Sequence, residues 1–172
     1  MKQKVDVTDY AELITKMLPK GILLNTMTDR FNSMVIGWGH LGTLWSIPTF
    51  VVYVRQSRFT KEMLDKSGEF TVSVPLAKVD PGINRICGTL SGRDIDKVKE
   101  TGITLEDPEV NHTPGIREYP LTIECKVIYT QDQVIKDIPD DIVRGHYPMK
   151  PDGSYDFHTM YVGQILDAYI IK

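Results

Sequence analysis

The features that this sequence lacks narrow the kinds of protein it can encode. Its only two cysteines, Cys87 and Cys125, lie far apart and outside any CxxC motif or zinc-finger spacing. None of its four histidines has a partner at the spacing of a helical metal site, and no serine lies in the GxSxG motif of a hydrolase. We therefore expect two reduced core thiols, and we expect no redox dithiol, metal site or nucleophilic triad.

Long apolar runs and blocks of one charge are also missing. No apolar segment approaches the roughly 20 residues of a membrane-spanning helix, and residues 1–10 lack the apolar core of a secretion signal. The 20 basic and 23 acidic residues are mixed along the chain, so no basic stretch is available to follow a nucleic-acid backbone or an anionic membrane. We expect a cytoplasmic protein that binds neither nucleic acid nor membrane.

Length and hydrophobic patterning predict one domain, over residues 1–172, that is mainly β with short helices. Segments rich in β-branched and aromatic residues, separated by turn residues, read as strands. They cover residues 21–27, 34–45, 49–55, 70–75, 121–134 and 157–171. The links between the first strands are too short for crossover helices, which predicts antiparallel strands that curl into a barrel.

Short helices are expected around this barrel. Residues 8–18 carry apolar side chains at helical spacing and end at Pro19, and residues 59–66 form a helix that Gly68 ends. Two further helices are predicted at residues 83–87 and 94–100, and a proline-containing excursion at residues 137–156 precedes the last strand.

Residues 37–42 match the dinucleotide fingerprint GxGxxG, but their context does not fit it. The mechanism needs a helix that opens at the glycines and an acidic residue about 20 positions later. Here Pro48 follows closely, and the position about 20 residues on is near Arg58. Glycines within a strand more often mark a bulge or the close approach of a flat molecule.

The segment Ser57-Arg58-Phe59-Thr60-Lys61 places two hydroxyls and two cations at the start of a predicted helix. Free backbone N–H groups and the helix dipole attract an anion there, and a guanidinium can bind two phosphate oxygens at once. A helix cap beside solvated charges accounts for the same residues. The spacing alone leaves both readings open.

Several of these segments, taken in order, resemble the flavin reductase-like, FMN-binding split-barrel family, and flavoredoxin-type members are the most similar. The resemblance rests on residues 32–38 (NSMVIGW), 57–60 (SRFT), 67–75 (SGEFTVSVP), 87–97 (CGTLSGRDIDK), His158 and 163–165 (GQI). Two features depart from the family pattern. Gln164 replaces the usual glutamate of the closing HxxxxGEV motif, and the 137–156 excursion is longer than the simple reductases need.

The resemblance implies a split barrel that forms a homodimer and completes two sites for non-covalently bound FMN. The implied ring-lining residues are Met34, Val35, Ile36, Gly37 and Trp38. The implied phosphate ligands are Ser57, Arg58, Thr60 and Lys61. The residues implied to close over the cofactor are Ser91, Gly92 and Arg93. His158 would stand where the electron donor arrives, and its charge would matter near pH 6.5 if it assists reduction.

The resemblance leaves two functions open. One is an NAD(P)H-dependent flavin reductase that passes electrons to free flavin or to a protein acceptor. The alternative is a flavoredoxin-like FMN electron carrier, or an FMN-binding module, without NAD(P)H activity. A structural barrel that binds no flavin is a third possibility.

Overall fold

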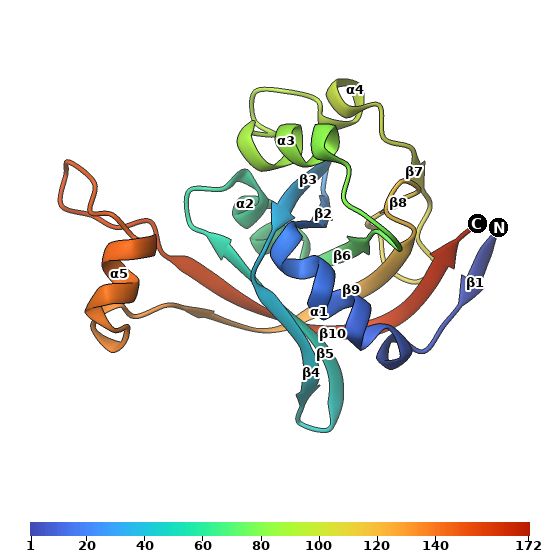
Figure 1. The fold of residues 1–172 in the computed structure, drawn as a ribbon, viewed down its shortest axis with the longest axis horizontal. Helices are drawn as coiled ribbons and strands as arrows, with labels where there is room; N and C mark the ends of the chain where they lie inside the picture. Colours follow the sequence, from blue (N-terminus) through green and yellow to red (C-terminus); the bar gives the residue numbers. More distant parts are fainter.

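An eight-stranded antiparallel sheet, curled around one core, forms the body of the molecule in the computed structural model, which describes residues 1–172 (Figure 1). Its strands are β1 (Lys2–Lys4), β2 (Ile22–Met27), β3 (Phe31–Ile36), β4 (Gly39–Leu44), β5 (Ile47–Arg55), β6 (Glu69–Val74), β9 (Leu121–Asp132) and β10 (His158–Ile171). A second, two-stranded sheet pairs β7 (Leu105–Glu106) with β8 (Gly115–Ile116). The predicted mainly β, antiparallel fold is confirmed.

Short helices surround the sheet. The α-helices are α1 (Ala11–Met17), α2 (Phe59–Ser67), α3 (Pro81–Thr89), α4 (Lys97–Thr101) and α5 (Asp140–His146). Single 3-10 turns lie at Val7–Tyr10, Leu18–Lys20 and Ile135–Asp137. Helices α3 and α4 lie together on one side of the barrel, whereas α5 lies at the end of an arm that extends from β9 and β10 (Figure 1). None of the helices is long and apolar enough to cross a membrane.

The strand order shows where the barrel is split. Hydrogen bonds run along the path β3-β2-β6-β9-β10-β5-β4, which leaves β3 and β4 at its two ends. These two edge strands are consecutive in the sequence, so residues 37 and 38 cross from one edge of the sheet to the other. The prediction of one strand over residues 34–45 is therefore wrong. Gly39 starts β4 at a φ of 154°, where an added Cβ would lie 2.5 Å from the Val51 carbonyl oxygen.

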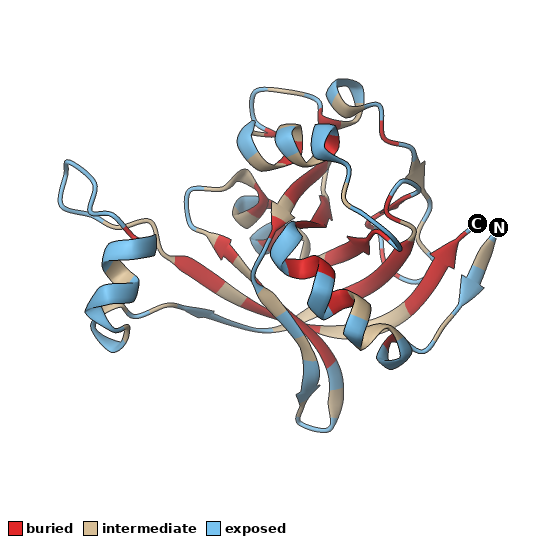
Figure 2. Ribbon diagram, in the orientation of Figure 1, coloured by how far each residue is buried: buried red, intermediate tan, exposed pale blue.

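The barrel core is apolar and closely packed. A cluster of 21 buried residues fills the interior, and six others form a second cluster beneath α3. At the bulge between Val162 and Gly163, a Cβ on Gly163 would lie 2.4 Å from Phe70, so the barrel closes there only around a glycine. Cys87 and Cys125 are buried and unpaired, as predicted. Figure 2 shows burial along the central strands, and exposure on α5 and the β4–β5 hairpin.

Helix boundaries differ from the prediction where aspartates cap them. The first helical segment opens as a 3-10 turn at Val7, because the Asp6 side chain accepts a hydrogen bond from the Thr8 amide. Helix α4 begins at Lys97 and not at residue 94, because Asp96 accepts from the amides of residues 98 and 99. Residues 91–95 are thereby left as a loop. Gly68 ends α2 in the left-handed conformation, at a φ of 65°, as expected.

Candidate functional site

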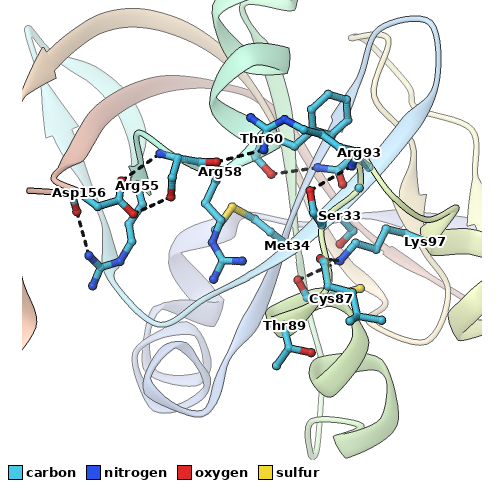
Figure 3. Close-up of a pocket in the computed structure, with 16 residues that line it drawn as sticks. Ser33, Met34, Arg55, Arg58, Thr60, Cys87, Thr89, Arg93, Lys97 and Asp156 are labelled. Carbon is cyan, nitrogen blue, oxygen red and sulfur yellow. Dashed lines mark hydrogen bonds between the residues drawn. The ribbon is translucent and has the colours of Figure 1, made fainter. Parts of the chain in front are cut away.

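Two adjoining cavities open beside the split of the barrel. The first has a volume of about 250 Å³ and lies between β3, the β5–α2 turn and the loop after α3 (Figure 3). The second has a volume of about 160 Å³ and follows β3 to Trp38. Met34, Arg55 and Arg58 line both cavities, so the two form one continuous site.

The first cavity is strongly cationic. Its charged lining residues are Arg55, Arg58, Arg93, Lys97 and Asp156. Four cations against one carboxylate suit a ligand that carries about two negative charges. The Arg58 side chain donates one hydrogen bond, to the Gly88 carbonyl oxygen at 3.1 Å, and makes no other to the protein. Most of its planar fork is thus available to an anion.

The N-terminus of α2 faces the same cavity. Arg58 is the N-cap residue, and no side chain caps the first turn. The first amides of a helix lack partners within the helix, and they carry the positive end of its dipole. Thr60 is held at the cavity wall because its Oγ1 accepts a hydrogen bond from Asn32 Nδ2 at 2.9 Å. The sequence left an anion site and a helix cap open for this segment; no side chain caps the helix, so the anion site stays the prediction.

The loop at residues 91–93 closes the cavity from the opposite side. Gly92 packs so tightly against β3 that an added Cβ would lie 2.1 Å from Asn32 Oδ1 and 3.1 Å from Phe59 Cδ1. Arg93 donates to the Ser57 carbonyl oxygen at 3.2 Å and pairs with Glu62 on α2. These contacts hold the loop against α2 and leave the arginine at the cavity rim.

Lys97 is a site residue that sequence reasoning did not single out. It is fully buried, and its Nζ donates to the carbonyl oxygens of Ile86 at 2.9 Å, Cys87 at 3.3 Å and Leu90. Burial lowers the pKa of this ammonium group. Lys97 therefore ties the end of α3 to the loop that closes the cavity. Its position at the end of the SGRDIDK segment was the available signal.

Lys61, predicted as a phosphate ligand, lies outside both cavities. Its Nζ pairs with Asp65 at 2.8 Å and lies 3.5 Å from the Tyr161 hydroxyl. Successive helical residues point about 100° apart, so Lys61 faces away from the wall that its neighbour Thr60 forms. The structure brings the other predicted phosphate ligands together and leaves this one out.

The second cavity is lined by all five residues that the resemblance assigned to a flavin ring. These are Met34, Val35, Ile36, Gly37 and Trp38. Met34 and Ile36 turn into the barrel core, so β3 presents its backbone edge along the cavity. Trp38 keeps 39% of its surface exposed at the split. A flat apolar ring beside backbone donors fits such a surface.

His158 lies under Trp38 and does not stand at an open mouth. It is 7% exposed, and its Nδ1 lies 2.9 Å from the Tyr147 hydroxyl. That hydroxyl donates its proton to Gln133 at 2.8 Å, so Nδ1 carries the imidazole proton and donates to Tyr147. Burial, helped by the nearby positive charge of Arg55, lowers the pKa of His158 to about 4. The lowered pKa argues against the expected charge change near pH 6.5.

The excursion at residues 137–156 packs against the second cavity. His146 and Tyr147 contact the Trp38 ring edge-on, at centroid distances of 5.3 and 6.5 Å. Arg55 fastens the excursion, because its guanidinium donates to the carbonyl oxygens of His146 at 2.9 Å and Asp156 at 2.8 Å. The sequence predicted an excursion, but it gave no sign that this segment would cover Trp38.

The lining residues fit FMN as a ligand. The cationic cavity suits its phosphate, and the surface beside β3 suits its ring. The donors left free at the wall of the first cavity are the uncapped amides at the start of α2 and most of the Arg58 guanidinium. These are the donors from which a phosphate accepts hydrogen bonds. No cluster of three or more histidine, cysteine, aspartate or glutamate side chains is placed to hold a metal ion.

The antiparallel sheet curls into a barrel that is open between β3 and β4, and the site lies at this opening. Such a fold is a split barrel. Residues 16–172 match the family described as flavin reductase like domain, and the chain belongs to that family. Its fold is similar to flavoredoxin of Desulfovibrio vulgaris, with a TM-score of 0.66 and 23% identity over 88% of this chain and 69% of that one. A Shewanella frigidimarina protein with a split barrel domain aligns at a TM-score of 0.65 and 16% identity, over 98% and 76%.

An FMN-binding domain of a flavin reductases-like enzyme from Shewanella baltica has a TM-score of 0.68 and 16% identity, covering 99% of this chain and 77% of that one. At the sequence level, an uncharacterized protein of Pyrococcus abyssi is 31% identical over 84% of this chain and 68% of its own length. The match to an uncharacterized Archaeoglobus fulgidus protein, also 31% identical, spans 45% of this chain and 43% of that protein.

Proposed function

We propose that this protein is an oxidoreductase that holds FMN non-covalently across the two cavities and transfers reducing equivalents through it. One observation carries this proposal. The cavity formed by the uncapped start of α2 and Arg58 adjoins the cavity along β3, at the split of the barrel. The phosphate would lie in the cationic cavity and the ring along residues 34–38. When bound, FMN supplies the electron chemistry.

The chain's own residues would bind and orient. Arg58, the α2 amides and Thr60 hold the phosphate, and the 91–93 loop covers it. Arg58 also lines the second cavity, so its positive charge stabilises negative charge that develops there. Neutral His158, oriented by its hydrogen bond to Tyr147, would act on the donor through the Trp38 indole that covers it, and it would supply no proton. No side chain needs to act as an acid or base.

NAD(P)H is the donor in the first form of this proposal, and free flavin or a redox protein is the acceptor. The second form is an electron carrier without NAD(P)H activity. One observation favours that alternative: His146 and Tyr147 of the excursion pack against Trp38 and occupy space beside the ring cavity. A protein partner that donates single electrons needs no stacking space there.

An anaerobic titration separates these readings. The purified protein is loaded with FMN, freed of excess flavin and mixed with NADH or NADPH while the flavin absorbance is followed. Rapid bleaching supports the reductase. A bound flavin that is bleached by dithionite but not by either nucleotide supports the carrier. A protein that fails to take up added FMN contradicts both forms and returns the chain to a structural role.

We propose further that the protein is a homodimer. Trp45 at the tip of the β4–β5 hairpin is 64% exposed, and Tyr129 on β9 beside it is 40% exposed. They border a hollow of about 410 Å³ whose other walls include Leu44, Met160 and Val162. Contiguous exposed aromatic surface of this kind suits a protein partner. A second copy is the occupant that the family membership favours.

A further inference from the structure

The one carboxylate in the cationic cavity occupies donors that a phosphate would use. Asp156 accepts hydrogen bonds from Ser57 through both of its side-chain oxygens. The Ser57 amide lies 3.0 Å from Oδ1, and the Ser57 hydroxyl lies 2.6 Å from Oδ2 (Figure 3). Asp156 belongs to the excursion, whereas Ser57 lies in the turn between the barrel strand β5 and α2.

These two bonds are separate from the others that hold this end of the excursion. The Arg55 guanidinium donates to the backbone carbonyl of Asp156, and the Gln56 amide donates to the backbone carbonyl of Phe157 at 2.9 Å. The second bond continues the pairing of β5 with β10, and neither bond uses the side chain of Asp156. The carboxylate can therefore leave Ser57 without undoing the strand pairing.

We propose that Asp156 is an internal anion that the FMN phosphate displaces from Ser57, so that cofactor binding releases one attachment of the excursion. The inference rests on the proposed function, because it requires FMN in this site. Each Ser57 donor has one proton, which a carboxylate and a phosphate cannot share at full strength. Two anions at this distance would also repel. Ser57 thus binds either Asp156 or the phosphate.

Displacement has a consequence for Trp38. The same excursion carries His146 and Tyr147 against that indole. Without the Asp156–Ser57 contact, two side-chain attachments of the excursion to the barrel remain here: the hydrogen bonds from Arg55, and the hydrogen bond between Tyr147 and His158. Occupation of the phosphate cavity would loosen the segment that covers the second cavity, and the covered face would open when cofactor is present.

Affinity measurements test the displacement. Dissociation constants for FMN and for riboflavin, which lacks the phosphate, are measured with the wild type, Asp156→Asn and Asp156→Ala. Removal of the competing carboxylate should tighten FMN binding by roughly tenfold in the alanine variant and by less in the asparagine variant. Riboflavin affinity should stay unchanged in both. Unchanged or weaker FMN binding in folded Asp156→Ala would show that Asp156 only supports the Ser57 turn, and would overturn the inference.

Proteolysis tests the release. Arg144 is exposed on α5, so trypsin cleavage after it reports the mobility of the excursion. Saturating FMN should speed this cleavage in the wild type, riboflavin should not, and Asp156→Ala should be cleaved quickly with or without flavin. Slower cleavage with FMN would contradict release. If Arg58→Ala leaves FMN affinity unchanged, the proposed site itself fails; if Arg58 matters and Asp156 does not, only this inference fails.

Discussion

The His158 ring lies 4.7 Å, centroid to centroid, from the indole of Trp38, although the two residues come from opposite parts of the chain. Trp38 marks the split between β3 and β4, and His158 begins the last strand. Their contact joins the strand that lines the second cavity to the strand that carries the excursion. A change at His158 is therefore expected to reach the second cavity through Trp38.

The first prediction concerns stability against pH. The pKa of His158 is about 4 in the folded protein and near 6.5 in the unfolded chain. As the pH falls below 6.5 the unfolded state takes up a proton that the folded state refuses, so stability is lost down to about pH 4. This loss amounts to roughly 3 kcal/mol.

Chemical unfolding of the wild type and of His158→Asn measures this pH-dependent loss of stability. The contributions of the other titrating groups cancel when the unfolding free energies of the two proteins are subtracted. The wild type should lose more unfolding free energy than the variant between pH 7 and pH 4.5. Parallel curves would show that His158 keeps an ordinary pKa.

The second prediction concerns reduction of the bound flavin. His158→Ala should slow anaerobic reduction while FMN affinity stays nearly unchanged, because the residue lines the ring cavity and not the phosphate cavity. Since the imidazole is neutral, the wild-type rate should show no step near pH 6.5. Tyr147→Phe is the matched variant: it removes the hydroxyl that orients the imidazole and should reproduce part of the effect. Loss of FMN and of thermal stability together would assign His158 a structural role.

The sequence predicted most strands because period-two patterning and turn residues are local signals. It missed the break at Gly37-Trp38, where an extended segment leaves one sheet edge and joins the other, since that crossing depends on how the whole sheet curls. It also placed Lys61 in the site, because residue type was read without the direction in which each helical position points. The roles of Lys97 and Asp156 arise from contacts between distant segments, which no local pattern contains.

Arg58 should contribute most to FMN affinity among the single side chains of the site. Arg58→Ala removes a charge-assisted contact worth roughly 1.5 to 3 kcal/mol and should weaken binding by about one to two decades. Arg58→Lys should recover part of the loss, because a point charge does not reproduce a fork. Arg85→Ala, at an exposed position on α3 that lines neither cavity, is the charge-matched control. Equal dissociation constants for the Arg58 and Arg85 variants would remove Arg58 from the phosphate site.

Gly92 is expected to tolerate no side chain. Gly92→Ala would place a methyl group against Asn32 and Phe59, so the 91–93 loop must shift away from α2. Such overpacking costs about 1 to 3 kcal/mol of stability and should weaken FMN binding as the cover over the cavity moves. Gly145→Ala is the control, because a Cβ there meets no atom within 4 Å and the position is helical. Thermal unfolding and flavin titration of both variants test this prediction. Similar melting temperatures and FMN affinities for the two variants would mean that the 91–93 loop is too mobile to seal the site.

The last prediction concerns assembly. If a second copy covers the hollow at the β4–β5 hairpin, sedimentation should show a dimer at micromolar concentration, with an interface above roughly 2,000 Å² in total. Trp45→Glu places a charge on that apolar surface and should shift the protein to monomers. Met149→Glu is a matched control, because Met149 is equally exposed, at 64%, but lies on the excursion. A wild-type monomer that still binds FMN would contradict the homodimer. A dimer broken by Met149→Glu and not by Trp45→Glu would instead place the interface on the arm that carries α5.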